Sequence, residues 1–350
     1  MNLTSDPIRV GLLGTAHTAH AASYLAALAK IPGAALSGIY DDEAQRGEQF
    51  AAQFQTPYYP VLDDLLSQAD LQGVIVCSET ARHKDLVCAA ARRGKHVLCE
   101  KPIAASRADA REMIAACRAA GVLLQTAFVC RFMPTVQAAR RQVQAGEAGR
   151  VLGIVGGNRG IPPLPPVYPD WITDPVLAGG GALLDHSVHV TDAMRFILGS
   201  EVESVYAQAG VFRQPNLQVE DCALLSLNFQ GGVVATVDPS WSLPANNPFQ
   251  YDFYLRILCE KGTIHLDDTR QALEVVSDLP QARAVTAEPF GMDIDMQMVQ
   301  HFVGCIRAGQ NLFPAASGED GLRALEIALA AYDSTRSCQP ETVLSPEEEA

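Results

Sequence analysis

Residues 94–102 read GKHVLCEKP, a short apolar run that leads directly into Glu-Lys-Pro. Proline disfavours a helical conformation at the residue before it, which here is Lys101. We therefore expect Lys101 at the carboxyl end of a strand, where open α/β sheets bind their ligands. A lysine in that place can supply positive charge or a proton to a substrate oxygen, whereas a lysine considered singly is by default a solvated surface residue.

The sequence before this stretch alternates between short apolar runs and helix-like segments. Strands are predicted at 8–13, 34–40, 74–77 and 96–99, with a further apolar run at 122–129, and helices at 16–29, 43–54, 85–93 and 106–120. Ser106 is the expected N-cap of the last helix and Gly121 its stop. Strands separated by helices of this size predict parallel βαβ units with right-handed crossovers.

The pattern changes near Gly149. Strands are predicted at 151–156, 203–211, 222–229, 232–237, 253–258 and 262–266, and turn residues rather than helices separate most of them. This pattern is typical of an antiparallel or mixed sheet. Helices are predicted at 183–198, 295–308 and 318–337. The fold class is therefore α/β followed by α+β.

Composition limits the classes of partner. The chain has 350 residues, 48% of them apolar and 19% charged, and a formal net charge of −14. An acidic surface repels phosphate backbones and anionic lipids, so we expect neither nucleic acid nor membrane as a partner. The nine cysteines form no C-x-x-C pair and no zinc-type cluster with histidine, which predicts reduced thiols in the cytoplasm and no metal site.

The stretch GLLGTAHTA at 11–19 has the strand, turn and helix start of a dinucleotide fingerprint, in which helix N–H groups receive the pyrophosphate. Gly14 holds the first position, but Ala16 and Ala19 replace the second and third glycines. Alanine at the second position narrows the approach of the backbone to the phosphates, and an ordinary strand-to-helix turn explains the segment equally well. Asp41 follows the next strand, where a carboxylate accepts bonds from the adenosine ribose and repels a 2′-phosphate; it is also a plausible N-cap. We therefore expect NAD, with NADP less favoured.

The stretch GGGALLDHSVHV at 179–190 places Asp185 and His189 four residues apart, on one face of a predicted helix. A carboxylate beside an imidazole orients it for general acid/base chemistry. His186 is expected to point about a quarter-turn away from Asp185. The alternative is a purely structural pair.

Together these segments resemble the glucose–fructose oxidoreductase/inositol dehydrogenase (Gfo/Idh/MocA) family over nearly the whole chain. GKHVLCEKP is the most specific element, supported by SETARH at 78–83, RFMP at 131–134, GGGALLDHSVH at 179–189 and GEDGLRALE at 318–326. The resemblance implies a Rossmann domain, residues 1–128, and a substrate-binding and oligomerisation domain, residues 129–350, built on a large open, mainly antiparallel sheet. It places the active site in the cleft between them.

The resemblance also implies site residues. Lys101, Asp185 and His189 match the catalytic positions. Cofactor contacts are expected from Gly14, Thr15, Ala16, Asp41, Ser78, Glu79, His83, Glu100 and Lys101, and substrate contacts from Lys101, Arg131, Trp171 and His189, with Arg159 on weaker grounds. Two departures stand out: Ala16, and Glu79 in place of a common proline. Glu79 is interpreted either as a group that contacts substrate or alters cofactor placement, or as a solvated loop residue.

The resulting hypothesis is an NAD(H)-dependent oxidoreductase acting on a secondary alcohol of a sugar, polyol or related molecule. His189 takes the hydroxyl proton with Asp185 orienting it, and Lys101 holds the developing oxyanion; which of His189 and Lys101 is the immediate base stays open. An NAD-dependent glycosidase and a non-catalytic NAD-binding regulator are the alternatives on the same fold. The open sheet predicts a homodimer or homotetramer.

Overall fold

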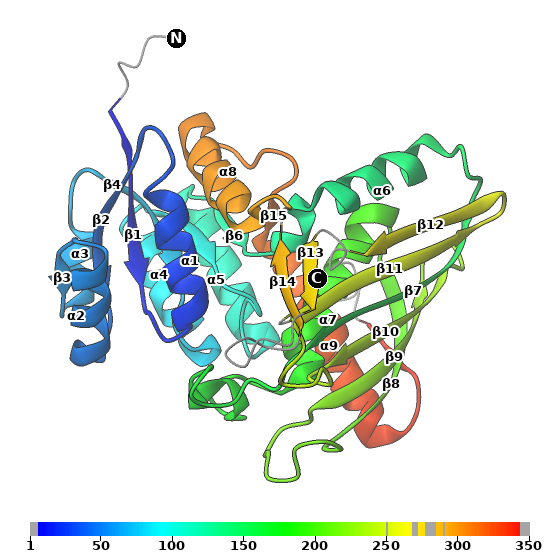
Figure 1. Ribbon diagram of the computed structural model, residues 1–350. Coiled ribbons are helices and arrows are strands. Elements are labelled where there is room, and N and C mark those ends of the chain that lie inside the picture. The colour runs from blue at the N-terminus through cyan, green and yellow to red at the C-terminus, as the bar shows by residue number, and fades with distance from the viewer. Residues whose placement is uncertain (1–5, 250, 268–271, 277–284, 290, 344–350) are drawn as a thin grey trace.

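The first sheet of the computed structural model is an open α/β sheet (Figure 1). The structure describes residues 6–249, 251–267, 272–276, 285–289 and 291–343. The parallel strands are β1 (Ile8–Leu13), β2 (Ala34–Tyr40), β3 (Tyr58–Tyr59), β4 (Leu71–Val76), β5 (His96–Cys99) and β6 (Leu124–Thr126). Their order is β6-β5-β4-β1-β2-β3, so the direction of winding reverses between β1 and β4. Doubly wound sheets bind ligands at this crevice, outside the carboxyl ends of the strands.

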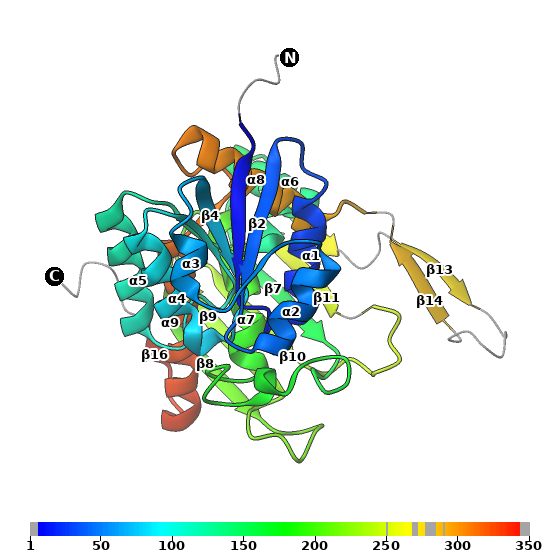
Figure 2. The ribbon, with the colours of Figure 1, turned by 90° about the vertical axis from the view of Figure 1, so that its left-hand side faces the viewer.

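Helices cover both faces of this sheet, which confirms the predicted parallel βαβ pattern. They are α1 (Thr18–Leu28), α2 (Ala44–Gln53), α3 (Leu62–Leu66), α4 (His83–Arg92) and α5 (Arg107–Ala120). Figure 2 shows α1 and α2 on one side of β1, β2 and β4, with α4 and α5 on the other. The ends of α5 lie where its caps predict, because the Ser106 side chain accepts from the Asp109 N–H and Gly121 adopts a φ of 65°.

The chain returns to the first sheet near its end. Strand β15 (Ala316–Ser317) pairs antiparallel with β6, and α8 (Ile294–Ala308) packs on α1. Apolar residues of α8, among them Phe302 and Ile306, share one buried cluster with β1 and α1. A division of the chain at residue 128 therefore does not follow the buried clusters, since the one around β1 and α1 includes residues of α8.

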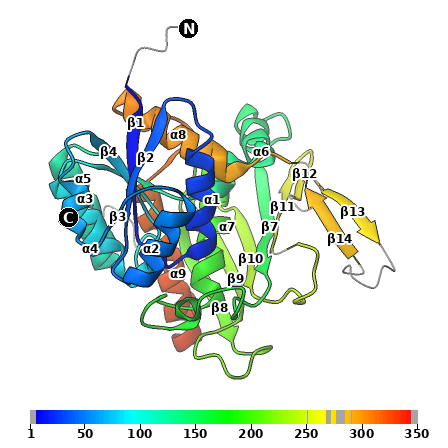
Figure 3. The same ribbon diagram turned by 60° about the vertical axis from the view of Figure 1, so that its left-hand side comes forward.

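The second sheet is mixed and mainly antiparallel. Its strands are β7 (Val151–Gly160), β8 (Val202–Gly210), β9 (Cys222–Phe229), β10 (Val234–Ser240), β11 (Tyr251–Cys259), β12 (Gly262–Asp267) and β16 (Glu341–Thr342). The order is β12-β11-β7-β10-β9-β8-β16, with β7 and β10 parallel and the other neighbours antiparallel. A separate hairpin of β13 (Ala272–Val276) and β14 (Val285–Pro289) projects beside it (Figure 3).

One face of the second sheet packs against helices. These are α7 (Ala182–Leu198) and α9 (Gly318–Ser337), with α6 (Pro134–Ala145) packed on α7. Along β9 buried and exposed residues alternate, as expected for a strand with one covered face. The outer face carries exposed apolar side chains, namely Leu152, Val155, Leu224, Val234 and Leu258. In the part of the chain that the structure describes, none of the helices has the length and hydropathy needed to cross a membrane.

Candidate active site

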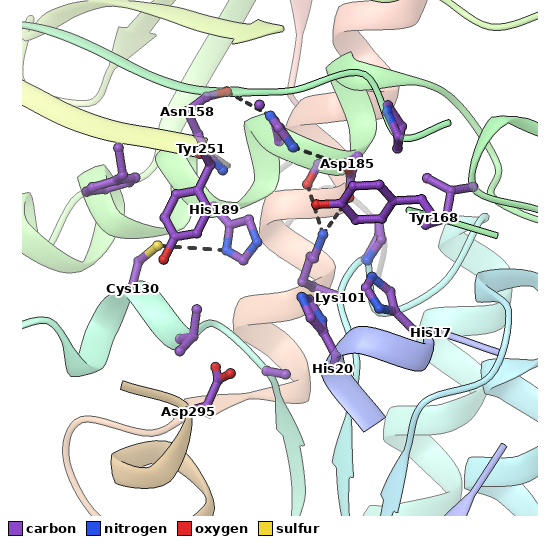
Figure 4. Close-up of a pocket in the computed structure, with 18 of the residues that line it drawn as sticks. His17, His20, Lys101, Cys130, Asn158, Tyr168, Asp185, His189, Tyr251 and Asp295 are labelled. Carbon is purple, nitrogen blue, oxygen red and sulfur yellow. Dashed lines mark hydrogen bonds and ion pairs between the residues drawn. The ribbon is translucent and has the colours of Figure 1, made fainter. Parts of the chain in front are cut away.

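A cavity of about 340 Å³ lies between the carboxyl edge of the first sheet and the second sheet (Figure 4). This volume is in the range of small-molecule sites. The loops that follow β1 and β5 supply His17 and Lys101, and α7 supplies Asp185 and His189. The three residues predicted to be catalytic therefore line one cavity, although Asp185 and His189 come from an element far along the chain from Lys101.

Lys101 and Asp185 form a buried ion pair. The Lys101 Nζ bonds to Asp185 Oδ1 and lies 3.4 Å from the Asp185 carbonyl oxygen. Asp185 Oδ2 accepts from the Trp241 indole N–H at 3.3 Å and lies 3.3 Å from His186 Nε2. His186 is held in turn by the Asn158 carbonyl oxygen, 2.8 Å from its Nδ1. The carboxylate thus has a partner on each oxygen, which fixes its orientation towards the lysine.

This arrangement differs from the predicted Asp185–His189 pair. The carboxylate of Asp185 contacts Lys101, His186 and Trp241, whereas the His189 Nδ1 lies 3.9 Å from the Cys130 Sγ. The four-residue spacing does place both side chains in the cavity. The spacing does not determine which side chain pairs with the Asp185 carboxylate, and in the structure its ionic partners are Lys101 and His186. The expected quarter-turn separation of His186 from Asp185 is wrong, because the ring folds back towards the preceding residue.

The electrostatics assign different charge states to the three groups. Burial alone would lower the pKa of Lys101, but Asp185 and Glu100 outweigh it and the pKa is raised. Burial would raise the pKa of Asp185, but Lys101 and His186 hold it well below its usual range. Burial and the charge of Lys101 both lower the pKa of His189 well below 6.5. At neutral pH the cavity therefore holds a charged lysine, a carboxylate and a neutral imidazole.

The dinucleotide turn requires glycine at position 14 and leads into a helix without a side-chain cap. Gly14 adopts a φ of 77°, and a Cβ there would lie 2.6 Å from the Ser78 Cβ. Helix α1 begins just beyond, and its N-cap residue His17 makes no side-chain capping bond. The N–H groups of the first helical turn are thus left for an anion. The carbonyl oxygen of Ala16 accepts the Trp171 indole N–H at 2.9 Å, so the second domain contacts this turn directly.

Asp41 follows β2 as predicted, but both oxygens of its carboxylate already accept hydrogen bonds from other residues of the protein. It is 0% exposed. It accepts from the backbone N–H and hydroxyl of Thr15 at 2.7 and 2.6 Å, from the Glu43 N–H at 2.8 Å, and from the Arg46 Nε and Nη2 at 3.0 and 2.8 Å. Arg46, which sequence reasoning did not identify, therefore stands with Asp41 at the expected ribose position.

Two further predicted cofactor residues, His83 and Glu100, have partners within the protein. The His83 ring is buried and bridges the carbonyl oxygens of Ser78 and Pro102, so it ties together the loops after β4 and β5. Glu100 is buried and accepts from the Lys101 backbone N–H at 3.0 Å, with His20 Nδ1 at 2.9 Å. Neither His83 nor Glu100 lines the cavity. Both side chains position the loops that carry the site.

Arg131, predicted to contact substrate, does not line the cavity. It is buried and bonds to Asp192 at 2.6 Å and Asp320 at 2.9 Å. These contacts join α7 and α9 to the segment before α6, which favours a structural role. Arg159 likewise pairs with Asp252. Trp171 does line the cavity, as predicted.

Several cavity residues were not identified from sequence. They are His17, His20, Cys130, Asn158, Tyr168, His186, Trp241, Tyr251, Asp293 and Asp295. His17 lies within the fingerprint stretch and His20 directly follows it, and their proximity to the turn was a usable signal. The others lie on or beside β7, β10, β11, α6, α7 and α8, or in the loop between β7 and α7, and only the tertiary fold brings them to one cavity.

Comparisons with known proteins agree with this architecture. A family model described as "Oxidoreductase family, NAD-binding Rossmann fold" matches residues 8–128, and a Gfo/Idh/MocA C-terminal domain model matches residues 136–265. Myo-inositol 2-dehydrogenase of Thermotoga maritima is 30% identical over 339 residues, covering 93% of this chain and 96% of that protein. The uncharacterized oxidoreductase YrbE of Bacillus subtilis is 31% identical over 326 residues, covering 90% and 91%.

Solved structures give the same result. The crystal structure of a probable dehydrogenase from Thermotoga maritima superposes with a TM-score of 0.82 at 27% identity, covering 96% of this chain and 99% of that one. The matches span both sheets. The chain therefore belongs to the Gfo/Idh/MocA family of oxidoreductases, whose N-terminal domain is an NAD-binding Rossmann fold.

Proposed function

We propose that the protein transfers a hydride between a secondary alcohol of a neutral sugar or polyol and NAD. One observation carries the proposal: a charged Lys101, held by Asp185, and a neutral His189 face a single cavity at the carboxyl edge of the NAD-binding sheet. The nicotinamide supplies the hydride chemistry. The side chains supply the proton transfer and the charge that alcohol oxidation requires.

The charge states assign the roles. His189 is neutral and can accept the hydroxyl proton as the carbinol carbon is oxidised. Lys101 is already protonated, so it donates a hydrogen bond to the reacting oxygen and stabilises negative charge that develops there. Asp185 acts on Lys101 rather than on His189, because its carboxylate keeps the ammonium group charged and in place. In the reverse direction His189 returns the proton to the carbonyl oxygen.

The cavity favours a neutral substrate. Among the described residues that line it, Lys101 is the one permanently charged cation, and Asp185 already neutralises it. Asp293 and Asp295 add negative charge. His20, for which burial would lower the pKa but Glu100 raises it, also lines the cavity, but it is paired with that carboxylate. A phosphorylated or acidic sugar would therefore find no cation that lacks a carboxylate partner. The rings of Trp171 and Trp241 offer apolar faces for the C–H groups of a sugar, and the myo-inositol and scyllo-inositol dehydrogenases among the relatives act on uncharged polyols.

The test is reduced-nicotinamide absorbance with NAD and a panel of sugars and cyclitols, each neutral compound paired with its phosphate ester. We expect turnover on neutral members only.

Lys101→Met should lower kcat by at least about 100-fold while NADH binding is retained. Aglycone release from glycosides without net NADH formation would instead indicate a glycosidase. NADH binding with no turnover across the panel would indicate a regulator.

Two further features support proposals about the oligomeric state and the cellular compartment. The exposed apolar face of the second sheet supports a homodimer or homotetramer built on that face. No disulfide joins the nine cysteines, and most of them are buried, which fits the reducing cytoplasm.

A further inference from the structure

Glu79 belongs to an ionic cluster at the carboxyl ends of β2 and β4. We define this cluster as Asp41, Asp42, Glu43, Arg46, Glu79 and Arg82. Glu79 Oε1 lies 3.8 Å from Arg46 Nη2, and Glu79 Oε2 lies 3.9 Å from Arg82 Nη1. Glu79 thus faces Arg46 and Arg82, beside Asp41 at the expected ribose position.

The donors of Arg46 are all directed at carboxylates. Its Nε and Nη2 bond to Asp41, and its Nη1 bonds to Glu43 at 3.0 Å. Arg82 bonds to Asp42 in the same way. The cluster contains four carboxylates and two guanidinium groups, so it carries an excess of two negative charges. Such a site repels a 2′-phosphate, although it contains an arginine of the kind that NADP-binding folds use.

Glu79 is the member whose presence the local structure explains least. The residue is buried, and its Oε2 makes no hydrogen bond within the described residues. A buried carboxylate without full hydrogen bonding is costly. Its main compensation is Coulombic attraction to the two arginines, so its charge acts on them and not on a hydrogen-bond network.

We propose that Glu79 is a specificity determinant of the cofactor site: its charge keeps Arg46 within the carboxylate cluster and so withholds that guanidinium from a 2′-phosphate. NAD has a hydroxyl in place of the 2′-phosphate, so the negative charge of the cluster does not repel it. The inference rests on the nicotinamide cofactor of the family and is independent of which alcohol the protein oxidises.

The test is calorimetric titration of the full-length protein with NADH and with NADPH. Glu79→Gln removes the charge but keeps the shape. We expect the Kd for NADPH to fall about tenfold, equivalent to ~1.4 kcal/mol, while the Kd for NADH changes less than about threefold. Glu48→Gln is the matched control, because Glu48 is an exposed glutamate on the same helix as Arg46. It should leave the ratio of the two Kd values unchanged.

A double-mutant cycle completes the test. If Arg46 receives the 2′-phosphate, the gain of Glu79→Gln disappears when Arg46→Ala is added. Glu79→Ala provides a second removal of the charge should the glutamine variant fold poorly, and NADH binding reports folding in every case. An unchanged Kd ratio in the Glu79 variants, or a gain that survives without Arg46, overturns the proposal. Because the readout is binding, it stands apart from any failure to find a substrate.

Discussion

Lys101 and Arg131 show that the role of a basic side chain depends on the partners that the fold brings to it. Lys101 and Arg131 both follow strands of the first sheet and both pair with aspartates, yet only Lys101 lines the cavity. Sequence could identify both as candidates because each lies in a recognisable stretch. It could not separate them, since the distinction depends on Asp192 and Asp320, which arrive from α7 and α9.

Replacement of Arg131 should therefore affect stability rather than substrate binding. Arg131→Met leaves Asp192 buried without its main partner, and we expect the free energy of unfolding to fall by about 3–5 kcal/mol. Urea unfolding measures this, with Arg159→Met as the control, since that partly exposed pair should contribute no more than about 1 kcal/mol. A raised KM at unchanged stability would restore Arg131 as a substrate ligand.

The pH dependence of alcohol oxidation should reflect His189 and Lys101. His189 accepts a proton only while neutral, and its lowered pKa keeps it neutral until the pH is well below 6.5. The raised pKa of Lys101 keeps that group charged to above pH 10.5. We expect kcat/KM to be flat between these limits and to fall only outside them. An acid limb centred near pH 6.5, or one that persists in His189→Asn, would contradict the assignment.

At the scale of elements, prediction succeeded where local signals are complete. The caps of α5 and the βαβ alternation identified the longer elements of the first sheet, whereas the short strand β3 and helix α3 were not predicted. Helix α6 was missed although Pro134 and Gly146 flank it. Strand β7 was predicted to end at Gly156, yet it continues to Gly160. The signal for that extension lies in the partner strand, and no local pattern contains it.

Gly156 marks a close approach of β7 to β11 and α7. A Cβ on Gly156 would lie 2.4 Å from Leu255 Cδ2 and 2.9 Å from Met194 Cε, so both of these side chains would have to shift to admit it. Gly156→Ala should lower the free energy of unfolding by about 1–3 kcal/mol. Gly153→Ala, whose nearest contacts would be at 3.3 and 3.6 Å, is the control in the same strand and should cost less. Equal losses in thermal unfolding would refute this explanation.

At the scale of the molecule, the two sheets share one chain path that crosses between them more than once. Helix α8 and strand β15 return to the first sheet after the second is built. The cavity is therefore bounded by residues early, middle and late in the chain. The resemblance to a family predicted both domains, but the sequence pattern alone did not predict the return, because a helix signal does not specify which sheet the helix covers.

The outer face of the second sheet provides a prediction at this scale. We expect the protein to sediment as a dimer or tetramer, because five apolar side chains on adjacent strands are exposed there. Leu224→Glu with Leu258→Lys should convert it to a monomer while circular dichroism stays unchanged. Analytical ultracentrifugation decides the question, and a monomeric parent protein would assign this face another role.

The chain contains two tryptophans, and both line the cavity. Trp171 contacts the dinucleotide turn through Ala16, while Trp241 contacts Asp185. When the protein is excited where tyrosine does not absorb, its tryptophan fluorescence therefore originates at the candidate active site. Reduced nicotinamide absorbs where tryptophan emits, so energy transfer makes the emission a direct optical signal of occupancy. Single Trp→Phe variants would divide that signal into a cofactor-side and a substrate-side probe, with no label added.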